Sequence, residues 1–416
     1  MTPANHPSPG EEVPVVDRRW LMRTYAEPPV TFVRGEGSVL VDDHGRRYLD
    51  FLSGLAVTSL GHAHPAVATA VAEQAATLVH VSNLFGNVLA PEVASTLDRL
   101  VGGGGAHAGG QVFFANSGAE ANECALKLAR RWAGRADGGG AVRPGVVCAD
   151  DAFHGRTLAT LAATGQEDKR RPFAPLPTGF VHVPYDDLDA LDRAVDPSTV
   201  GAVLVEAIQG EAGVVVPSSD YLARVRQLCT DRGVLLIVDE VQTGLGRTGA
   251  WFAFQHEGIT PDIVTVAKAL GNGVPVGACW ARAEVAAVFS PGDHGSTFGG
   301  QPLAMAAARA TLAAMEAEEV PRRAARSGAR LAAGLLAIEG VDAVRGRGLL
   351  LGVVLSAPAA VAATRAALEA GLVVNAPRPD VLRLAPSLLV SDDEIDEAVG
   401  ILAAVLPAAL DEGVRQ

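Results

Sequence analysis

The sequence predicts an α/β protein whose large domain has a mostly parallel seven-stranded sheet and whose smaller domain is α+β. Seven short segments rich in Val, Ile and Leu alternate with helical periods between residue 64 and about residue 310. Their apolar character is continuous rather than alternating, which is typical of parallel strands covered on both faces. The chain has 416 residues, of which 49% are hydrophobic, so it can bury sizeable cores.

The predicted elements follow an order that brings distant parts of the chain together in the smaller domain. Two apolar runs flank Asp43, His44 and Gly45, which predicts a β-hairpin. A long helix is expected at 302–319, followed by further helices and strands and a last helix from about Asp392. The seven strands of the large sheet are expected at 111–116, 146–150, 180–185, 201–208, 234–240, 262–269 and 277–282.

Composition and element order then divide the chain into four segments. Residues 1–20 are rich in Pro and acidic side chains, which predicts a flexible N-terminal arm. Residues 65–310 are expected to form the large domain. The smaller domain is expected to combine residues 21–64 with residues 311–416.

Charge and cysteine usage exclude several classes of function. The net charge is −13, and the sequence has no run of basic residues that could bind along a phosphate backbone. No nucleic-acid partner is therefore expected. With no 18-residue apolar run and no basic-then-apolar leader, a cytoplasmic protein without a membrane partner is expected. No HExxH motif or His/Cys cluster is present, so no metal is expected. Four cysteines without CxxC spacing are expected as reduced core residues: Cys124, Cys148, Cys229 and Cys279.

The first chemical feature is the junction of a strand and a helix at Ser117. Ser117 followed by Glu120 has the spacing of a capping box, which by itself indicates only a well-made helix start. The same geometry also suits a phosphate, because the N–H groups of Gly118 and Ala119 and the Ser117 hydroxyl lie at the positive helix end. The small side chains at these positions leave room for a phosphate to approach the N–H groups.

Two further features follow apolar strands. Asp239 lies at the carboxyl end of one strand, where open α/β sheets bind ligands, although an acid there is also common in a turn or a helix cap. Lys268 lies at the end of another apolar run, 29 residues later in the sequence. A desolvated lysine is a competent nucleophile toward an aldehyde, whereas an ordinary strand-end lysine extends its amine into water.

These three features together match the needs of pyridoxal phosphate. Its phosphate binds at a helix end, its pyridine nitrogen pairs with an acid, and its aldehyde reacts with a lysine. The sequence therefore predicts pyridoxal phosphate as the cofactor.

A series of ordered motifs also resembles a known family. The motifs extend from about Tyr25 to about residue 405, and they are FVRGEG, YLDFLSG, GHAHP, NSGAEANE, FHGRT, EAIQGEAG, DEVQTGLGRTG, AKALGNG, GSTFGGQP, RGRGLLLG and RLAPSL. They are similar to those of the class III (ornithine-type) pyridoxal-phosphate aminotransferases, which have the fold of type I pyridoxal-phosphate transferases. Within that family, and with His154 in FHGRT, the resemblance is closest to the acetylornithine aminotransferases of arginine biosynthesis.

The resemblance implies roles for the cofactor-binding residues. Lys268 matches the lysine that binds the cofactor and moves the reacting proton, and Asp239 matches the partner of the pyridine nitrogen. The other matched cofactor positions are Phe153 and Val241 on the ring faces, Gln242 at the phenolic oxygen, Gly118 and Ala119 at the phosphate, and Thr297 reaching that phosphate from a second subunit. A homodimer with shared active sites is therefore expected.

The resemblance also implies the substrates. Arg156 and Arg383 match carboxylate-binding positions, Glu206 matches a glutamate that pairs with the Arg383-type residue for one substrate only, and Ser296 matches a contact of acetylornithine. The expected reaction is ping-pong transfer of the δ-amino group of N2-acetyl-L-ornithine to 2-oxoglutarate. Transaminases of ornithine, succinylornithine or 4-aminobutyrate are the alternatives within the class, and a catalytically silent binding protein of the same fold is the alternative outside it.

Overall fold

Seven strands form the central sheet of the large domain. The computed structural model of the chain describes residues 18–134 and 143–414, so the predicted arm at 1–20 lies largely outside the described residues. The sheet has the order β4-β10-β9-β8-β7-β5-β6. Its strands are β4 (Gly110–Ala115), β5 (Gly145–Ala149), β6 (Phe180–Val183), β7 (Val200–Glu206), β8 (Leu235–Asp239), β9 (Ile263–Val266) and β10 (Gly277–Arg282). All seven coincide with predicted strands, and β10 alone runs against its neighbours, so the prediction of a mostly parallel sheet is confirmed.

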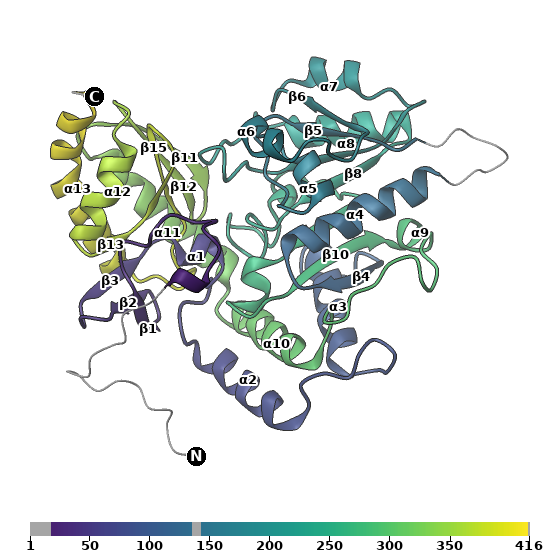
Figure 1. Cartoon of the computed structure of the whole chain (residues 1–416), viewed down its shortest axis with the longest axis horizontal. Coiled ribbons are helices and arrows are strands. Elements are labelled where there is room, and N and C mark those ends of the chain that lie inside the picture. The colour runs from purple at the N-terminus through teal and green to yellow at the C-terminus, as the bar shows by residue number, and fades with distance from the viewer. Residues whose placement is uncertain (1–17, 135–142, 415–416) are drawn as a thin grey trace.

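Helices cover both faces of this sheet, which explains why its strands are apolar throughout. Leu204 and Ile237 pack with Leu128 of α4 in one cluster, whereas their chain neighbours Val203 and Leu236 belong to the cluster on the other face. The helices of the large domain are α2 (Pro65–Thr77), α3 (Leu89–Val101), α4 (Gly118–Ala133), α5 (Leu158–Ala163), α6 (Glu167–Arg170), α7 (Leu188–Ala194), α8 (Tyr221–Arg232), α9 (Ala283–Ala286) and α10 (Pro302–Ala317). Figure 1 shows α4 crossing the sheet.

Two smaller sheets form the second domain, at the left of Figure 1. The first has the order β1-β2-β3-β13 and the second the order β11-β12-β15-β14. Their strands are β1 (Phe32–Glu36), β2 (Val39–Asp42), β3 (Arg47–Asp50), β11 (Val341–Arg347), β12 (Leu350–Leu355), β13 (Leu372–Val373), β14 (Asn375–Arg378) and β15 (Val381–Leu384). The helices with them are α1 (Ser53–Ala56), α11 (Val320–Leu336), α12 (Ala360–Glu369) and α13 (Asp392–Val414).

Pairing within the smaller domain confirms the predicted hairpin and also joins distant parts of the chain. β2 and β3 form the hairpin around Gly45, with Val41 opposite Arg47. β13 pairs in parallel with β3, so the C-terminal part of the chain rejoins the N-terminal hairpin. A buried arginine also ties the two domains together. Arg247, in the loop after β8, donates to the carbonyl oxygens of Leu349 and Pro386, at 3.1 and 2.5 Å.

Strand ends differ from the prediction where the backbone turns. The strand expected at 262–269 ends at Val266, because Lys268 has a left-handed φ of 43° and begins the short 3-10 helix Lys268–Gly271. Lys268 therefore does not close the strand but lies two residues beyond it. The strands predicted at 201–208 and 180–185 likewise end early, at Glu206 and Val183.

Three carboxyl-terminal strand ends lie side by side in this sheet. Glu206 of β7 is in register with Asp239 of β8, and Asp239 is in register with Thr265 of β9. The amino end of α4 follows β4. This edge is where open α/β sheets form their ligand crevice.

Candidate active site

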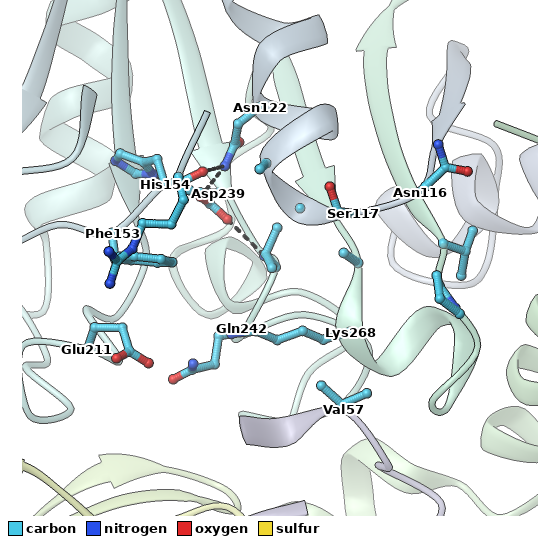
Figure 2. Close-up of a pocket in the computed structure, with 18 of the residues that line it drawn as sticks. Val57, Asn116, Ser117, Asn122, Phe153, His154, Glu211, Asp239, Gln242 and Lys268 are labelled. Atoms are coloured by element: carbon cyan, nitrogen blue, oxygen red, sulfur yellow. Dashed lines mark hydrogen bonds and ion pairs between the residues drawn. The ribbon is translucent and has the colours of Figure 1, made fainter. Parts of the chain in front are cut away.

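A cavity of about 470 Å³ lies beyond these strand ends, within the size range of small-molecule sites. Ten of the predicted site residues line it: Ser117, Gly118, Ala119, Phe153, Arg156, Glu206, Asp239, Val241, Gln242 and Lys268. Figure 2 shows Ser117, Phe153, Gln242 and Lys268 around this cavity, from the start of α4, the loops after β5 and β8, and the turn after β9. Ser296, Thr297 and Arg383 are the predicted site residues that do not line it.

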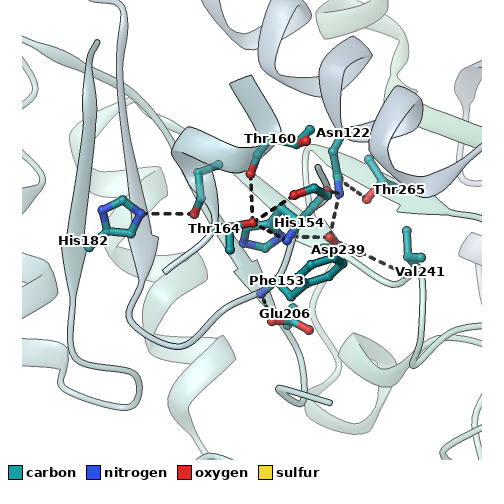
Figure 3. A network of polar contacts seen from close by, with 12 residues as sticks. Asn122, Phe153, His154, Thr160, Thr164, His182, Glu206, Asp239, Val241 and Thr265 are labelled. Atoms are coloured by element: carbon teal, nitrogen blue, oxygen red, sulfur yellow. Dashed lines mark hydrogen bonds and ion pairs between the residues drawn. The ribbon is translucent and has the colours of Figure 1, made fainter. Parts of the chain in front are cut away.

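Asp239 accepts three hydrogen bonds from residues that also line the cavity. Its Oδ2 accepts from Asn122 Nδ2 at 2.7 Å and from His154 Nδ1 at 2.8 Å, and its Oδ1 accepts from the Val241 N–H at 3.0 Å. Thr265 Oγ1 donates to Asn122 Oδ1 at 2.7 Å, which directs the Asn122 amide N–H toward Asp239 (Figure 3). The carboxylate is thus held in one orientation by α4, the FHGRT loop and the loop after β8, and β9 acts on it through Asn122.

Lys268 contrasts with Asp239, because no hydrogen bond or ion pair of its amine is found among residues 18–134 and 143–414. Burial lowers the pKa of this lysine to about 8, and the neighbouring Glu211 opposes the decrease. A lysine with a lowered pKa has more neutral amine near neutral pH, which is the form that attacks a carbonyl or accepts a proton.

The amino end of α4 opens into the same cavity. Ser117 Oγ accepts from the Glu120 N–H at 3.2 Å, which is one half of the predicted capping box. The reciprocal half is wrong, because Glu120 Oε2 accepts from the N–H of Asn116, at 2.5 Å, instead of Ser117. A Cβ on Gly118 would lie 2.8 Å from Val241 Cγ1, so no larger residue fits there without displacing Val241. Gly118 and Ala119 both line the cavity, so this helix end can receive an anion there.

Arg383 reaches the cavity through two residues that line it. It is 1% exposed, and its Nη1 donates to Glu211 Oε1 at 2.5 Å and to Gln242 Oε1 at 3.3 Å. Its Nε donates to Asn375 Oδ1 at 3.1 Å. Nη2 is buried and has no hydrogen-bond partner within the described part of the chain, so part of the guanidinium remains unsatisfied.

The predicted pairing of Glu206 with Arg383 is wrong. Glu206 Oε2 instead accepts from the Phe153 N–H at 3.0 Å, and the partner of Arg383 is Glu211, the second glutamate of EAIQGEAG. The physical reason is the turn after β7, which carries Glu211 to β15, whereas Glu206 stays at the strand end beside Asp239. Burial raises the pKa of Glu206 to about 7.

The remaining predicted residues are Arg156, which lines the cavity, and Ser296 and Thr297, which lie in one loop. Arg156 is exposed, and its Cζ lies 5.7 Å from the centroid of the Phe153 ring. Ser296 Oγ accepts from Asn116 Nδ2 at 3.1 Å, which places it next to a residue that lines the cavity. Thr297 is exposed in the same loop.

Four residues of the site were not assigned a role from the sequence: Asn122, His154, Glu211 and Thr265. Asn122 and Glu211 stand within quoted motifs, NSGAEANE and EAIQGEAG, so the motifs already held a signal for them. His154 stands within the motif FHGRT, and its contact with Asp239 depends on the fold. In the part of the chain that the structure describes, no group of acids, histidines and cysteines is arranged to bind a metal, and no helix has the length and hydropathy to span a bilayer.

Comparisons with known proteins agree with this geometry. The family model for class-III aminotransferases matches residues 21–406. The chain is 51% identical over 390 residues to the acetylornithine aminotransferase of Corynebacterium efficiens, covering 93% of this chain and 94% of that protein. It is similar to a structure of Toxoplasma gondii ornithine aminotransferase with partial occupancy of PLP at its active site, with a TM-score of 0.88, 36% identity and coverage of 96% and 94%. For the acetylornithine aminotransferase of Elizabethkingia anophelis the TM-score is 0.81, with 34% identity and coverage of 93% and 96%.

Proposed function

The chain belongs to the class-III aminotransferase family, and we propose that it transfers the δ-amino group of N2-acetyl-L-ornithine to 2-oxoglutarate. The products are N-acetyl-L-glutamate 5-semialdehyde and L-glutamate, a step of arginine biosynthesis. The observation that carries this proposal is the convergence of Asp239, Lys268 and the open end of α4 on one cavity. The 51% identity to an acetylornithine aminotransferase supports the choice of donor.

The residues of the cavity fit pyridoxal phosphate. The amino end of α4 at Gly118 offers free N–H groups to a phosphate, and Asp239 offers a carboxylate already held by three donors. The half-buried Lys268 lines a wall of the cavity, and its amine has no hydrogen-bond partner in the described residues. When bound, the cofactor supplies an electron sink that stabilises negative charge on the carbon bearing the amine.

Each cavity residue then has a proposed task. Asp239 keeps the pyridine nitrogen protonated, and Gln242 bonds the phenolic oxygen. Lys268 Nζ accepts the proton from the amine-bearing carbon of the donor and returns it later. The other proposed contacts are Phe153 and Val241 on the ring faces, and Ser117, Gly118 and Ala119 at the phosphate.

The two substrates are proposed to use the same cavity in turn. Arg383 binds the carboxylate next to the reacting carbon of 2-oxoglutarate or glutamate, since a guanidinium forms two parallel bonds with a carboxylate. Acetylornithine has no carboxylate beside its δ-carbon, and Glu211 then neutralises Arg383 as it does in the structure. Arg156 binds the carboxylate at the far end of either substrate, and Ser296 contacts the acetylated donor.

A homodimer in the cytoplasm, with Thr297 entering the partner's site, is also proposed. A cluster of large apolar side chains beside the 296–300 loop supports this: Leu84, Phe85, Val88 and Phe298 are 85%, 71%, 77% and 60% exposed. Asn83 Nδ2 joins their loop to the Ser296 carbonyl oxygen at 3.0 Å. Exposed apolar clusters of this kind commonly mark protein interfaces.

A donor panel tests the proposed function. The purified, cofactor-loaded protein is assayed with acetylornithine, succinylornithine, ornithine and 4-aminobutyrate, each with 2-oxoglutarate. The highest kcat/KM is expected for acetylornithine. A clear preference for 4-aminobutyrate or ornithine would overturn the choice of donor, and absence of turnover with all four would overturn the proposal.

A further inference from the structure

Lysines are rare in this chain, and one of them has no assigned role. Of 34 basic residues only three are lysines, namely Lys127, Lys169 and Lys268. Lys169 lies on α6, on the side of the large domain that faces the smaller domain in Figure 1. It is half-buried, and its Nζ lies 5.1 Å from the centroid of the Phe153 ring, which lines the cavity.

Lys169 and Arg156 share this aromatic ring. The Arg156 guanidinium carbon lies 5.7 Å from the same ring centroid. An aromatic face attracts cations, so Phe153 holds both beside the cavity.

Neither of these two cations has a carboxylate partner in residues 18–134 and 143–414. The Lys169 amine donates to the amide oxygen of Gln166, which carries no charge. By contrast, Arg378 pairs with Asp151 at 2.7 Å and Arg383 pairs with Glu211 at 2.5 Å. Beside the cavity there are thus two positive charges that form no ion pair with the described residues, because the nearby Glu211 is paired with Arg383. The net charge of the whole chain is nevertheless −13.

Two like charges that share one aromatic ring repel each other, and of these two Lys169 is half-buried whereas Arg156 is exposed. Burial is the largest cause that lowers the pKa of Lys169; Glu211 opposes this, while Arg156, Arg378 and Arg383 add to it. An anion placed between Lys169 and Arg156 would remove the repulsion and satisfy both, as bound carboxylates do with paired cations. The arrangement therefore indicates a ligand that brings its own negative charge.

We propose that Lys169 acts with Arg156 to bind the carboxylate at the non-reacting end of the substrate, which makes Lys169 a specificity-determining residue. This inference rests on the proposed function, because acetylornithine and 2-oxoglutarate both carry such a carboxylate. Lys169 selects for it by charge, and it takes no part in the proton transfer.

The test compares two acceptors with wild-type protein and Lys169→Met, both loaded with cofactor. With 2-oxoglutarate the KM is expected to rise roughly threefold to tenfold with little change in kcat, because a half-buried ion pair is lost. With 2-oxobutyrate, which lacks the second carboxylate, kcat/KM is expected to stay unchanged. Inhibition by glutarate is expected to weaken by the same factor as 2-oxoglutarate binding, and inhibition by butyrate is not.

Two further variants keep the test decisive. Lys169→Arg retains the charge and is expected to restore most of the affinity for 2-oxoglutarate. Arg171→Met removes a charge from an exposed neighbour that pairs with Asp168, and it is expected to leave both acceptors unaffected. An unchanged visible spectrum of the bound cofactor shows that the Lys169→Met site is intact.

Some results would overturn the proposal. One is an equal fall in kcat/KM with both acceptors in Lys169→Met, and the other is an unchanged KM for 2-oxoglutarate. Failure of the proposed function is a separate outcome, because a wild-type preference for another donor leaves the comparison of the two acceptors intact.

Discussion

The two sides of the cavity are built in opposite ways. On one side the Asp239 carboxylate accepts three hydrogen bonds, from Asn122, His154 and Val241. On the other side Arg156 and Lys268 have no ion pair within the described residues, and Arg383 keeps one buried nitrogen without a partner. The Asp239 carboxylate is therefore held before any ligand arrives, and on that side His154 Nε2 is the buried nitrogen that lacks a partner within the described residues. The second side leaves charges to be satisfied by ligands.

This difference matches two kinds of task. A group that tunes a permanently bound cofactor benefits from fixed neighbours, because preorganised dipoles need no rearrangement during the reaction. A group that meets two substrates in turn needs a partner it can exchange. Glu211 provides such a partner for Arg383, at 2.5 Å, and it is less buried than the arginine, at 26% against 1% side-chain exposure.

Removing Lys268 should produce the largest effect, because it deletes the proposed reactive group of the open side. Lys268→Ala is expected to lower kcat by at least about a thousandfold, since both the nucleophile and the proton-transfer group are lost. Steady-state assays measure the loss, and the visible spectrum shows whether cofactor remains attached. Lys268→Arg keeps a cation without a reactive amine and should be equally impaired. Activity within tenfold of wild type in either variant would contradict the assignment.

Changing Asp239 tests the side of the cavity that is hydrogen-bonded before a ligand binds. Asp239→Asn removes the charge and places an amide N–H opposite the donors of Asn122 or Val241, so kcat is expected to fall by about a hundredfold. The neighbouring Glu240 is buried but does not line the cavity, and Glu240→Gln serves as the matched control. If the two variants lose activity equally, Asp239 acts only through stability, which a thermal unfolding measurement would reveal.

Replacing each of the two glutamates of EAIQGEAG in turn tests which of them is the partner of Arg383. Glu211→Gln weakens the hold on Arg383 and should lower kcat/KM for acetylornithine by about tenfold, because an unpaired guanidinium then faces the uncharged donor carbon. The kcat/KM for 2-oxoglutarate should be unaffected. Glu206→Gln, assayed in the same way, should not discriminate between the two substrates. The reverse pattern would restore Glu206 as the partner that alternates with substrate.

The pH dependence of stability gives the smallest expected effect. The pKa of Lys268 falls from 10.5 to about 8 in the folded state, so its protonated form destabilises the fold below pH 8. That cost fades as the pH rises from about 8 to 10.5, since only the unfolded chain then binds the proton. Cofactor-free Lys268→Met should therefore be more stable than cofactor-free wild type at pH 7 by roughly 2 kcal/mol.

Urea unfolding of both proteins at pH 7 and at pH 10 measures this difference in the free energy of unfolding. The difference should shrink toward zero at the higher pH. A difference that is constant with pH would mean that the Lys268 amine is well solvated in the folded protein.

Sequence patterns predict best those features that depend on residues close together in the chain. Continuous apolar runs located all seven strands of the large sheet, and polar residues at strand ends located Asp239 and, within two residues, Lys268. The network around Asp239 could not be predicted in this way, because α4 and the FHGRT loop reach it only in the folded molecule. His154 and Asn122 are 85 and 117 positions away from it along the chain.

The two glutamates show a different limit. Glu206 and Glu211 stand five positions apart in one motif, and the sequence alone allows either of them to pair with Arg383. The choice depends on how the chain turns after β7, where Val214 adopts a left-handed φ of 57° and Gly213 one of 99°. Neither side-chain chemistry nor periodicity encodes the path of that turn.

The central claim is that one cavity serves two substrates in succession. On one side it holds Asp239 in a fixed network of hydrogen bonds, and on the other it offers unpaired groups to the substrates. Its most direct test is a half-reaction with cofactor-loaded protein and acetylornithine in the absence of 2-oxoglutarate. One equivalent of N-acetylglutamate semialdehyde per active site should form and the reaction should stop. Later addition of 2-oxoglutarate should give one equivalent of glutamate. Product formation only when both substrates are present together would contradict the account.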